Sequence, residues 1–186
     1  MNVLSKIVVA LVLVFSTTIA SAWTLESPVS GNIKNRTVTG YSFGSNWYEG
    51  YCNGLVKKHT GVDVESYVGE PVYAAYDGWV KVAQTNSTWV GFVTIDHAPT
   101  HTFLLTTVYW HINPAVSANT WVNKGSLIGY VGYLASGTHF HFGVREAAYS
   151  NASNVGALPQ TACGGYPAFP SSFINPMSLQ YENNPN

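Results

Sequence analysis

Charged residues are scarce in this chain. Lys, Arg, Asp and Glu together make up 9% of its 186 residues, whereas soluble domains average roughly 25%. The formal net charge is -1, and the chain has no basic stripe that could neutralise a phosphate backbone. The sequence therefore predicts no nucleic-acid partner. Solubility must depend on neutral polar residues such as Asn, Ser, Thr and Tyr.

Long apolar runs are also lacking, apart from one near the N-terminus. Residues 7–15 are apolar without interruption, and a more polar stretch then leads to Ala20-Ser21-Ala22. This order is typical of a secretory signal peptide, so we expect cleavage near Ala22 and removal of residues 1–22. The run is shorter than the roughly 20 residues of a membrane-spanning helix, and an uncleaved anchor is the alternative. The mature protein is expected to be secreted or periplasmic, without membrane association.

Cysteine is limited to Cys52 and Cys163. In an exported protein an even pair indicates first a disulfide bond. The alternative is a pair of thiolate zinc ligands. Their wide separation and the oxidising destination argue against that alternative.

Helical periodicity is missing from the mature chain, and its length suits one domain. Short β-branched and aromatic runs alternate with turn residues, which favours a mainly β, antiparallel sheet or sandwich with short loops and little helix. We expect residues 71–76 and 79–83 to form a hairpin across Asp77-Gly78, followed by strands over 89–96, 102–111, 127–131 and 138–144. Residues 23–50 are expected to be loops with one or two short strands, 51–149 a compact core, and 150–186 an irregular, proline-rich tail pinned by the disulfide.

Four histidines lie where they can act together. In an extended segment alternate side chains share a face, so His59 and Asp63 point the same way with Gly61 between them. His139 and His141 likewise share one face of a strand, and His111 ends a strand on the face of Tyr109. Imidazole and carboxylate are both good zinc ligands. Each pattern alone is a weak signal, because a single histidine is more often an ordinary packed side chain.

Five motifs in one order carry a family resemblance. They are the H-x-G-x-D of residues 59–63, the G-x-P-V-x-A-x-x-x-G-x-V of 69–80, the Y-x-H of 109–111, the V-x-K-G-x-x-I-G-x-x-G of 122–132 and the H-x-H-F-x-V of 139–144. In these motifs the chain resembles the lysostaphin-like (LytM-type) zinc endopeptidases of peptidase family M23. The resemblance covers about residues 55–146.

The resemblance implies roles for five side chains. His59, Asp63 and His141 would bind one Zn²⁺, and His111 and His139 would be catalytic histidines beside the metal. Three protein ligands leave a position open for water, as a catalytic zinc requires. The implied activity is hydrolysis of peptide bonds, in peptidoglycan or a glycine-rich peptide, by a monomer. Which histidine is the general base, and which bond is cut, stay open.

Two stretches depart from the family pattern. The segment 132–138 is shorter than usual, and Thr138 stands where proline is common, which puts the bond preference in doubt. His97 and His101 are spaced like a helical zinc pair, but Pro99 between them makes a helix improbable. We therefore interpret both as loop histidines.

Three other functions compete with a zinc endopeptidase. A non-catalytic scaffold of the same fold, which binds wall material or activates other wall hydrolases, would be missing a ligand. A carbohydrate-binding β-sandwich would use the 6 Trp and 12 Tyr residues but leaves the five motifs unexplained. A zinc dipeptidase would need a longer spacing between His59 and Asp63.

The disulfide is directly testable. We expect Cys52 and Cys163 to be bonded in protein recovered from outside the cytoplasm, because that compartment is oxidising. Mass spectrometry of the unreduced, alkylated protein should find a mass two protons lower than the dithiol and a cross-linked peptide pair. Two alkylated thiols would contradict the expectation.

Overall fold

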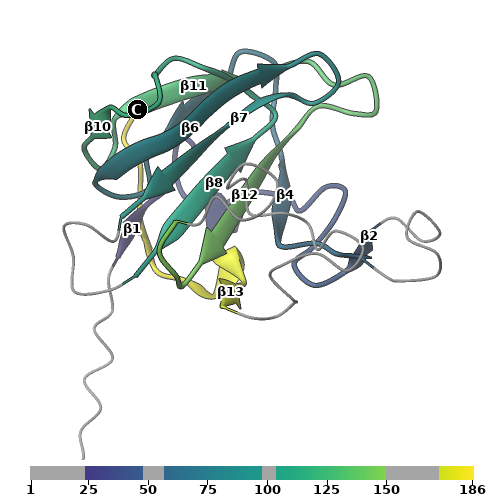
Figure 1. Ribbon diagram of the computed structural model, residues 1–186. Coiled ribbons are helices and arrows are strands. Elements are labelled where there is room, and N and C mark those ends of the chain that lie inside the picture. Colours follow the sequence, from purple (N-terminus) through teal and green to yellow (C-terminus); the bar gives the residue numbers. More distant parts are fainter. Residues whose placement is uncertain (1–23, 48–56, 98–103, 150–171) are drawn as a thin grey trace, which may run out of the picture.

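A computed structural model describes residues 24–47, 57–97, 104–149 and 172–186 of the chain (Figure 1). The predicted signal peptide, both cysteines and His101 lie outside these ranges. The described part is mainly β with antiparallel sheets, which confirms the expected fold class. Within these ranges, helix is limited to two 3-10 turns, Ile33–Asn35 and Pro176–Ser178. Among the described residues, no helix has the length and apolarity that crossing a membrane requires.

A seven-stranded sheet forms the body of the domain (Figure 1). Its strand order is β10-β6-β7-β8-β12-β13, and β4 also pairs with β12. The strands are β4 Gly61–Glu65, β6 Gly78–Asn86, β7 Val90–Asp96, β8 Thr106–Trp110, β10 Trp121–Val122, β12 His139–Arg145 and β13 Phe173–Ile174. Strand β12 therefore lies in the interior of the sheet, with β4 and β8 hydrogen-bonded to it.

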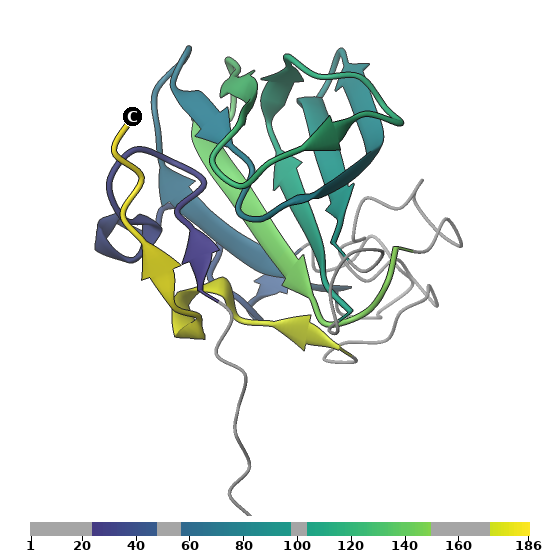
Figure 2. The ribbon, with the colours of Figure 1, turned by 90° about the vertical axis from the view of Figure 1, so that its left-hand side faces the viewer.

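Smaller sheets complete the domain. Strands β5 Pro71–Tyr73, β11 Leu127–Val131 and β9 Ile112–Pro114 form a three-stranded sheet in the order β5-β11-β9. Strand β2 Asn46–Trp47 pairs with β3 Lys57–Lys58. Strand β1 Leu25–Glu26 pairs in parallel with β14 Tyr181–Glu182, so segments from the two ends of the chain lie side by side (Figure 2).

The core lies between the large sheet and the smaller ones. In β12, alternate residues face toward this core and away from it. Phe140 and Phe142 are fully buried in the core cluster with Tyr109 of β8, and the rings of Tyr109 and Phe142 lie 5.3 Å apart. The histidines of β12 alternate with these phenylalanines and so face the other way. Burying two phenyl rings pins the register of β12, because a shift by one residue would turn them out of the core.

The predicted hairpin across Asp77-Gly78 is wrong. Strand β5 pairs with β11 and not with β6. After β5, the Ala74 N–H donates to the Ser126 carbonyl at 2.8 Å, and the Asp77 carboxylate accepts from the Lys124 N–H at 2.6 Å. These bonds carry the chain from the small sheet to the large one. The Asp-Gly pair therefore marks a change of sheet, which local turn chemistry cannot distinguish from a hairpin.

The C-terminal segment differs from the irregular tail that we expected. Strand β13 extends the large sheet along the end of β12, and β14 pairs with β1. Asn184 adds an isolated bridge to Gly31. Each of these strands has only two residues, too few for periodicity to reveal. The pairing depends on contacts with β12 and with the N-terminal segment, which are distant in the sequence.

His97 lies outside the strands, as expected, but in the interior of the protein instead of on an exposed loop. It follows β7 directly and is fully buried, with its Nδ1 2.7 Å from the Asp77 carbonyl and its Nε2 2.8 Å from the Thr107 hydroxyl. Because the carbonyl only accepts, Nδ1 carries a hydrogen. The Thr107 hydroxyl also lies 3.0 Å from the Tyr109 hydroxyl, and burial raises the pKa of Tyr109 to about 12. This polar network joins β7, β8 and the turn after β5.

Replacing His97 tests the network. We expect His97→Leu to lower the free energy of unfolding by about 1–3 kcal/mol, because the Asp77 carbonyl and the Thr107 hydroxyl lose their partner in the interior. Urea denaturation measures the change. The zinc content serves as the control, since His97 lies outside the candidate ligand set. An unchanged unfolding midpoint would contradict a structural role for this histidine.

Candidate metal centre

Three predicted ligands meet where β4 pairs with β12. In this antiparallel pair Asp63 lies opposite His141, and His59 precedes β4 by two residues. His59 Nε2 is 2.9 Å from His141 Nδ1 and 3.2 Å from Asp63 Oδ1. His141 Nδ1 is 3.0 Å from the same Asp63 oxygen. All three side chains are buried, so one donor atom from each converges on a single point inside the protein.

Gly61 makes room for the His141 ring. A Cβ at Gly61 would lie 2.6 Å from His141 Nε2 and 2.4 Å from the Phe142 carbonyl oxygen. Glycine at this position leaves space beside β4. In the structure, the space that it leaves is occupied by the imidazole of a ligand, because β12 packs directly against β4 there.

The second oxygen of Asp63 is held separately. Asp63 Oδ2 accepts from the Tyr41 backbone N–H at 3.2 Å and lies 3.6 Å from His139 Nε2. The backbone of residues 39–41 runs along β4, where the Thr39 N–H donates to the Asp63 carbonyl at 3.0 Å. The N-terminal segment therefore orients the carboxylate. Sequence analysis missed this contribution, because a backbone N–H leaves no signature in the residue type.

Electrostatics favours an anionic Asp63 beside a neutral His141. Burial opposes ionisation of Asp63, but hydrogen bonds from His141 and His59 outweigh that cost and hold its pKa well below the usual range. Burial also lowers the pKa of His141. A neutral imidazole and an ionised carboxylate are the protonation states in which these groups bind a metal.

The three donor atoms fit a zinc ion. Tetrahedral zinc with bonds of roughly 2.0–2.1 Å keeps its ligand atoms roughly 3.3 Å apart, and the three separations here run from 2.9 to 3.2 Å. Two imidazoles and one carboxylate are a common ligand set for zinc, and three protein ligands leave a coordination position for water. Within the described ranges, these residues alone form a group that could hold a metal.

His139 lies next to the ligands on β12. Its Nδ1 is 2.8 Å from the Gly137 carbonyl, which requires a hydrogen on Nδ1. In the neutral ring Nε2 is then unprotonated, and this atom points toward Asp63. The ring is 4.6 Å from that of His111, measured between centroids.

His111 reaches the same place through an unusual backbone. The expected regular strand through residue 111 would put its side chain on the core face with Tyr109, and this part of the prediction is wrong. Strand β8 ends at Trp110, and His111 has a φ of 65°, which a side-chain-bearing residue adopts only rarely. The ring consequently lies against His139 and, at 6.4 Å, His141.

Hydrogen bonding and burial set the state of His111. Its Nδ1 is 3.2 Å from the Trp89 carbonyl, so Nδ1 is the donor and Nε2 the acceptor. Burial and the neighbouring His139 and His141 rings lower the pKa of His111 to about 3, which keeps it neutral at pH 7. The carbonyls of Trp89 and Gly137 thus orient the two non-ligand histidines, and the sequence pattern names neither residue.

The family assignment rests on a match over more than half of the chain. The model of peptidase family M23 matches residues 57–155, which is more than half of the 186 residues. The chain belongs to peptidase family M23. The match spans β3 to β12 and so contains all three candidate ligands and both adjacent histidines. No curated protein matches the chain significantly.

Solved structures share the M23 fold. Csd3 of Helicobacter pylori is 26% identical with a TM-score of 0.50, and the alignment covers 69% of this chain and 33% of that one. The antimicrobial peptidase lysostaphin from Staphylococcus simulans is 23% identical with a TM-score of 0.53, covering 71% and 51%. The SpoIIQ–SpoIIIAH pore-forming complex contains a chain that is 18% identical with a TM-score of 0.56, covering 86% and 92%. This M23 chain therefore spans a third to a half of the length of the first two.

The crowding at Gly61 predicts a specific metal defect. We expect Gly61→Ala to weaken zinc binding about 10- to 100-fold, because the added methyl group displaces the His141 ring, and misplacing a ligand has effects of that size. Competition with a chromophoric chelator measures the affinity, with His141→Ala as the reference for a lost ligand.

Gly129→Ala is the matched control. A Cβ at Gly129 would lie 2.7 Å from the Asn113 carbonyl oxygen, so the crowding is similar but occurs in the small sheet. Both glycine variants should lose stability, and only Gly61→Ala should lose zinc affinity. Equal zinc affinity in the two would contradict the placement of His141 as a ligand.

Proposed function

We propose that the protein is a zinc metalloendopeptidase that hydrolyses peptide bonds in the peptide part of peptidoglycan. The observation that carries this proposal is the approach of His111 and His139 to a buried His59–Asp63–His141 cluster. One Zn²⁺ held by these three residues would supply Lewis-acid activation of a water molecule and of the scissile carbonyl. His111 and His139 would supply the proton transfers.

The two non-ligand histidines are suited to that task. In their neutral forms both present an unprotonated Nε2, because each Nδ1 donates to a backbone carbonyl. A ring in this state can take a proton from the attacking water. Once protonated, it can donate to the oxyanion or to the leaving amine. Burial of His111 excludes bulk water from one side of the reaction.

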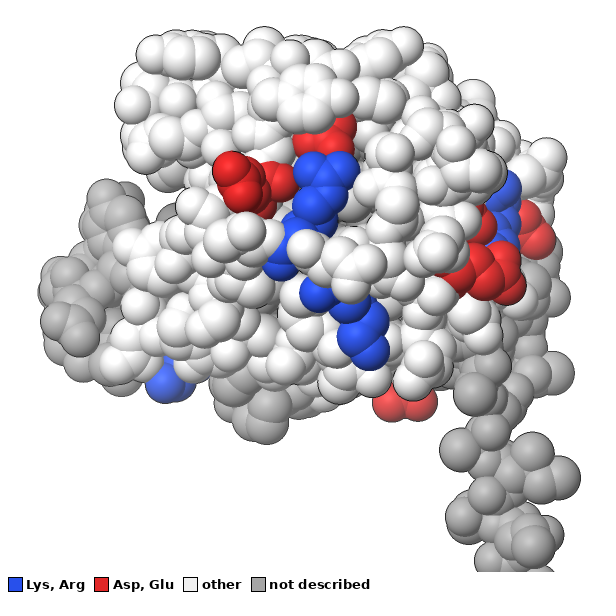
Figure 3. Space-filling model, turned by 180° about the vertical axis from the view of Figure 1, so that it is seen from behind, with Lys and Arg blue, Asp and Glu red and all other residues white. Residues whose placement is uncertain are grey.

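The wall substrate rests on similarity and on the surface. The motifs resemble those of lysostaphin-like enzymes, and lysostaphin itself is an antimicrobial peptidase. The face in Figure 3 is mostly uncharged, and its few charged side chains lie in small groups of both signs. Such a surface avoids strong repulsion from a polyanionic wall. We further propose export by the N-terminal segment and action as a monomer.

A non-catalytic scaffold is the alternative. A chain of the SpoIIQ–SpoIIIAH pore-forming complex shares the fold, so the fold alone does not decide the activity. The presence of three candidate ligands and two adjacent histidines favours the enzyme, because a scaffold needs none of their chemistry. Digestion of purified peptidoglycans of different cross-link type, followed by identification of the new termini, tests both the activity and the bond.

Removing either non-ligand histidine separates catalysis from metal binding. We expect His111→Ala and His139→Ala each to lower the hydrolysis rate by a factor of about 10² to 10⁴, the usual effect of losing a general base or an oxyanion donor. Zinc content and the unfolding midpoint report whether the site and fold persist. If either variant keeps near-normal turnover, that histidine is structural and the proposed mechanism fails for it.

A further inference from the structure

A polar cavity of about 480 Å³ is lined by residues that neighbour Trp89 and His111 in the sequence. Its walls come from the tip of the β6–β7 hairpin, from β9 and from the loop after β11. Asn113 in its lining follows His111 by two residues. Val90 in its lining directly follows Trp89, whose carbonyl holds His111 Nδ1. The cavity therefore adjoins the turn that positions His111.

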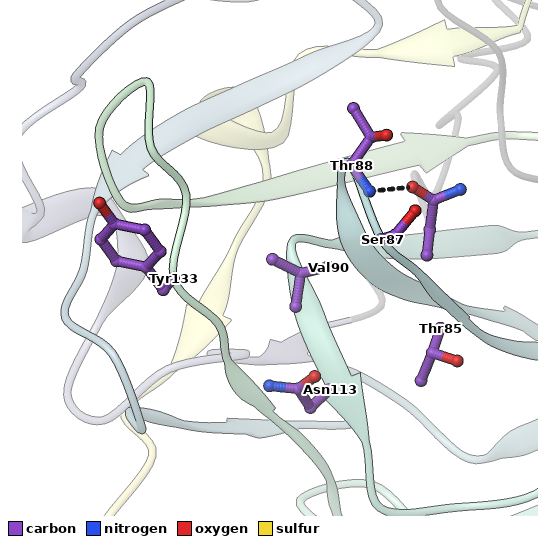
Figure 4. A pocket seen from close by; sticks show the side chains of 7 residues that line it. Thr85, Ser87, Thr88, Val90, Asn113 and Tyr133 are labelled. Atoms are coloured by element: carbon purple, nitrogen blue, oxygen red, sulfur yellow. Dashed lines mark hydrogen bonds between the residues drawn. The ribbon is translucent and has the colours of Figure 1, made fainter.

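Neutral polar groups dominate the lining. Thr85, Ser87 and Thr88 provide hydroxyls, and Asn86 and Asn113 provide amides. Figure 4 shows these hairpin residues on one side, Tyr133 on the other, and Val90 with Asn113 between them. In the part of the chain that the structure describes, no Asp, Glu, Lys, Arg or His side chain lines the cavity. Such a lining suits a neutral ligand rather than an ionised one, because it offers no counter-charge.

Two backbone N–H groups of the hairpin tip are already bonded within the tip. Asn86 Oδ1 accepts from the N–H groups of Thr88 and Trp89 at 2.8 and 2.9 Å. The side-chain oxygen of Asn86 thus holds the turn, and the NH₂ group of the same side chain stays available as a donor to a ligand. The wall is preformed, so binding there would not require ordering of the turn.

Val90 is strained at the centre of this wall. The Gly91 N–H donates to the Trp89 carbonyl at 2.9 Å, which makes Val90, with a φ of 72°, the middle residue of a γ-turn. Turns of this hand are rare and strained, and a β-branched residue there is an outlier. A Cβ added at Gly132 would lie only 2.2 Å from the Val90 side chain. Strain of this kind persists mainly at binding and catalytic sites.

Tyr133 supplies an aromatic surface. It is 71% exposed although it stands beside a cavity, where an apolar ring would normally be covered. An exposed aromatic ring on one side, with hydroxyls and amides on the other, matches the two surfaces of a sugar: an apolar C–H face and a rim of hydroxyls.

We propose that this cavity is a saccharide subsite that binds an N-acetylated hexosamine of the wall glycan. The inference rests on the proposed function, since it places the glycan next to the peptide that His111 and His139 would cleave. Tyr133 stacks on the sugar ring, the hairpin hydroxyls and Asn113 bond its hydroxyls and N-acetyl group, and Val90 forms the floor. Carboxylates of the stem peptide are disfavoured in the cavity because no cationic side chain among the described residues lines it.

Binding of a chitin oligomer tests the subsite without turnover. The probe is tetra-N-acetylchitotetraose, titrated into ¹⁵N-labelled His139→Ala protein. We expect shifts of the backbone resonances of Thr85, Ser87 and Asn113. We also expect Tyr133→Ala in that background to weaken the affinity about tenfold, the usual effect of truncating an aromatic anchor. Tyr133→Phe, which keeps the ring, should bind within about threefold of the parent.

Tyr67→Ala is the matched control. Tyr67 is 63% exposed and does not line the cavity, so its loss should leave the affinity unchanged. No shifts with the oligomer, or equal affinity of the Tyr133→Ala protein, would overturn the proposal. Shifts of the cavity residues with end-blocked pentaglycine but not with the oligomer would also overturn it, in favour of a neutral peptide. The binding result is independent of hydrolysis, so failure of the peptidase activity would be seen separately in the wild-type digestion.

Discussion

The antiparallel pairing of β4 with β12 is the constraint on which the candidate site depends. It sets Asp63 opposite His141 and requires glycine at position 61, because the His141 ring occupies the space of a side chain there. Phe140 and Phe142 on the other face of β12 are fully buried. The hydrophobic packing of these rings therefore sets the register that brings the polar groups together. Metal ligands are costly to bury alone, and the phenyl rings contribute the offsetting free energy.

Backbone groups orient the side chains around this pair. The Trp89 and Gly137 carbonyls hold the Nδ1 atoms of His111 and His139, and the Tyr41 N–H holds Asp63 Oδ2. Outer partners of this kind fix ring orientation and tautomer in metal sites. They also explain why strained backbone gathers here. His111 and Val90 both have left-handed φ values, and both flank the Trp89 carbonyl.

The ends of the chain close the domain around the same strands. Residues 39–41 run along β4, β13 extends the sheet beside β12, and β14 pairs with β1. The Arg36–Glu70 ion pair ties the N-terminal segment to the turn before β5. The M23 motifs lie within residues 59–144, and segments outside the motifs thus provide part of the contacts that hold them in place. In this chain, the support includes the backbone N–H that positions a metal ligand.

The mainly β class, the family and the residues of the candidate site could be predicted from the sequence. The period of two in residues 139–142 puts the histidines on one face of the strand and the phenylalanines on the other. The H-x-G-x-D spacing puts His59 and Asp63 on a common face. These are local properties, because side-chain direction in a strand depends only on the position along it.

Only the tertiary structure decided how these segments meet. The Asp77-Gly78 turn changes sheets instead of closing a hairpin, because β5 finds its partner in β11. His111 leaves the core face through a left-handed φ that Trp89 and Gly132 hold by hydrogen bonds. His97 is a buried network residue because Asp77 reaches it from the turn after β5 and Thr107 from β8. In each case the deciding contact joins residues far apart in the chain, or opposes the local preference of the residue, so no local pattern could contain it.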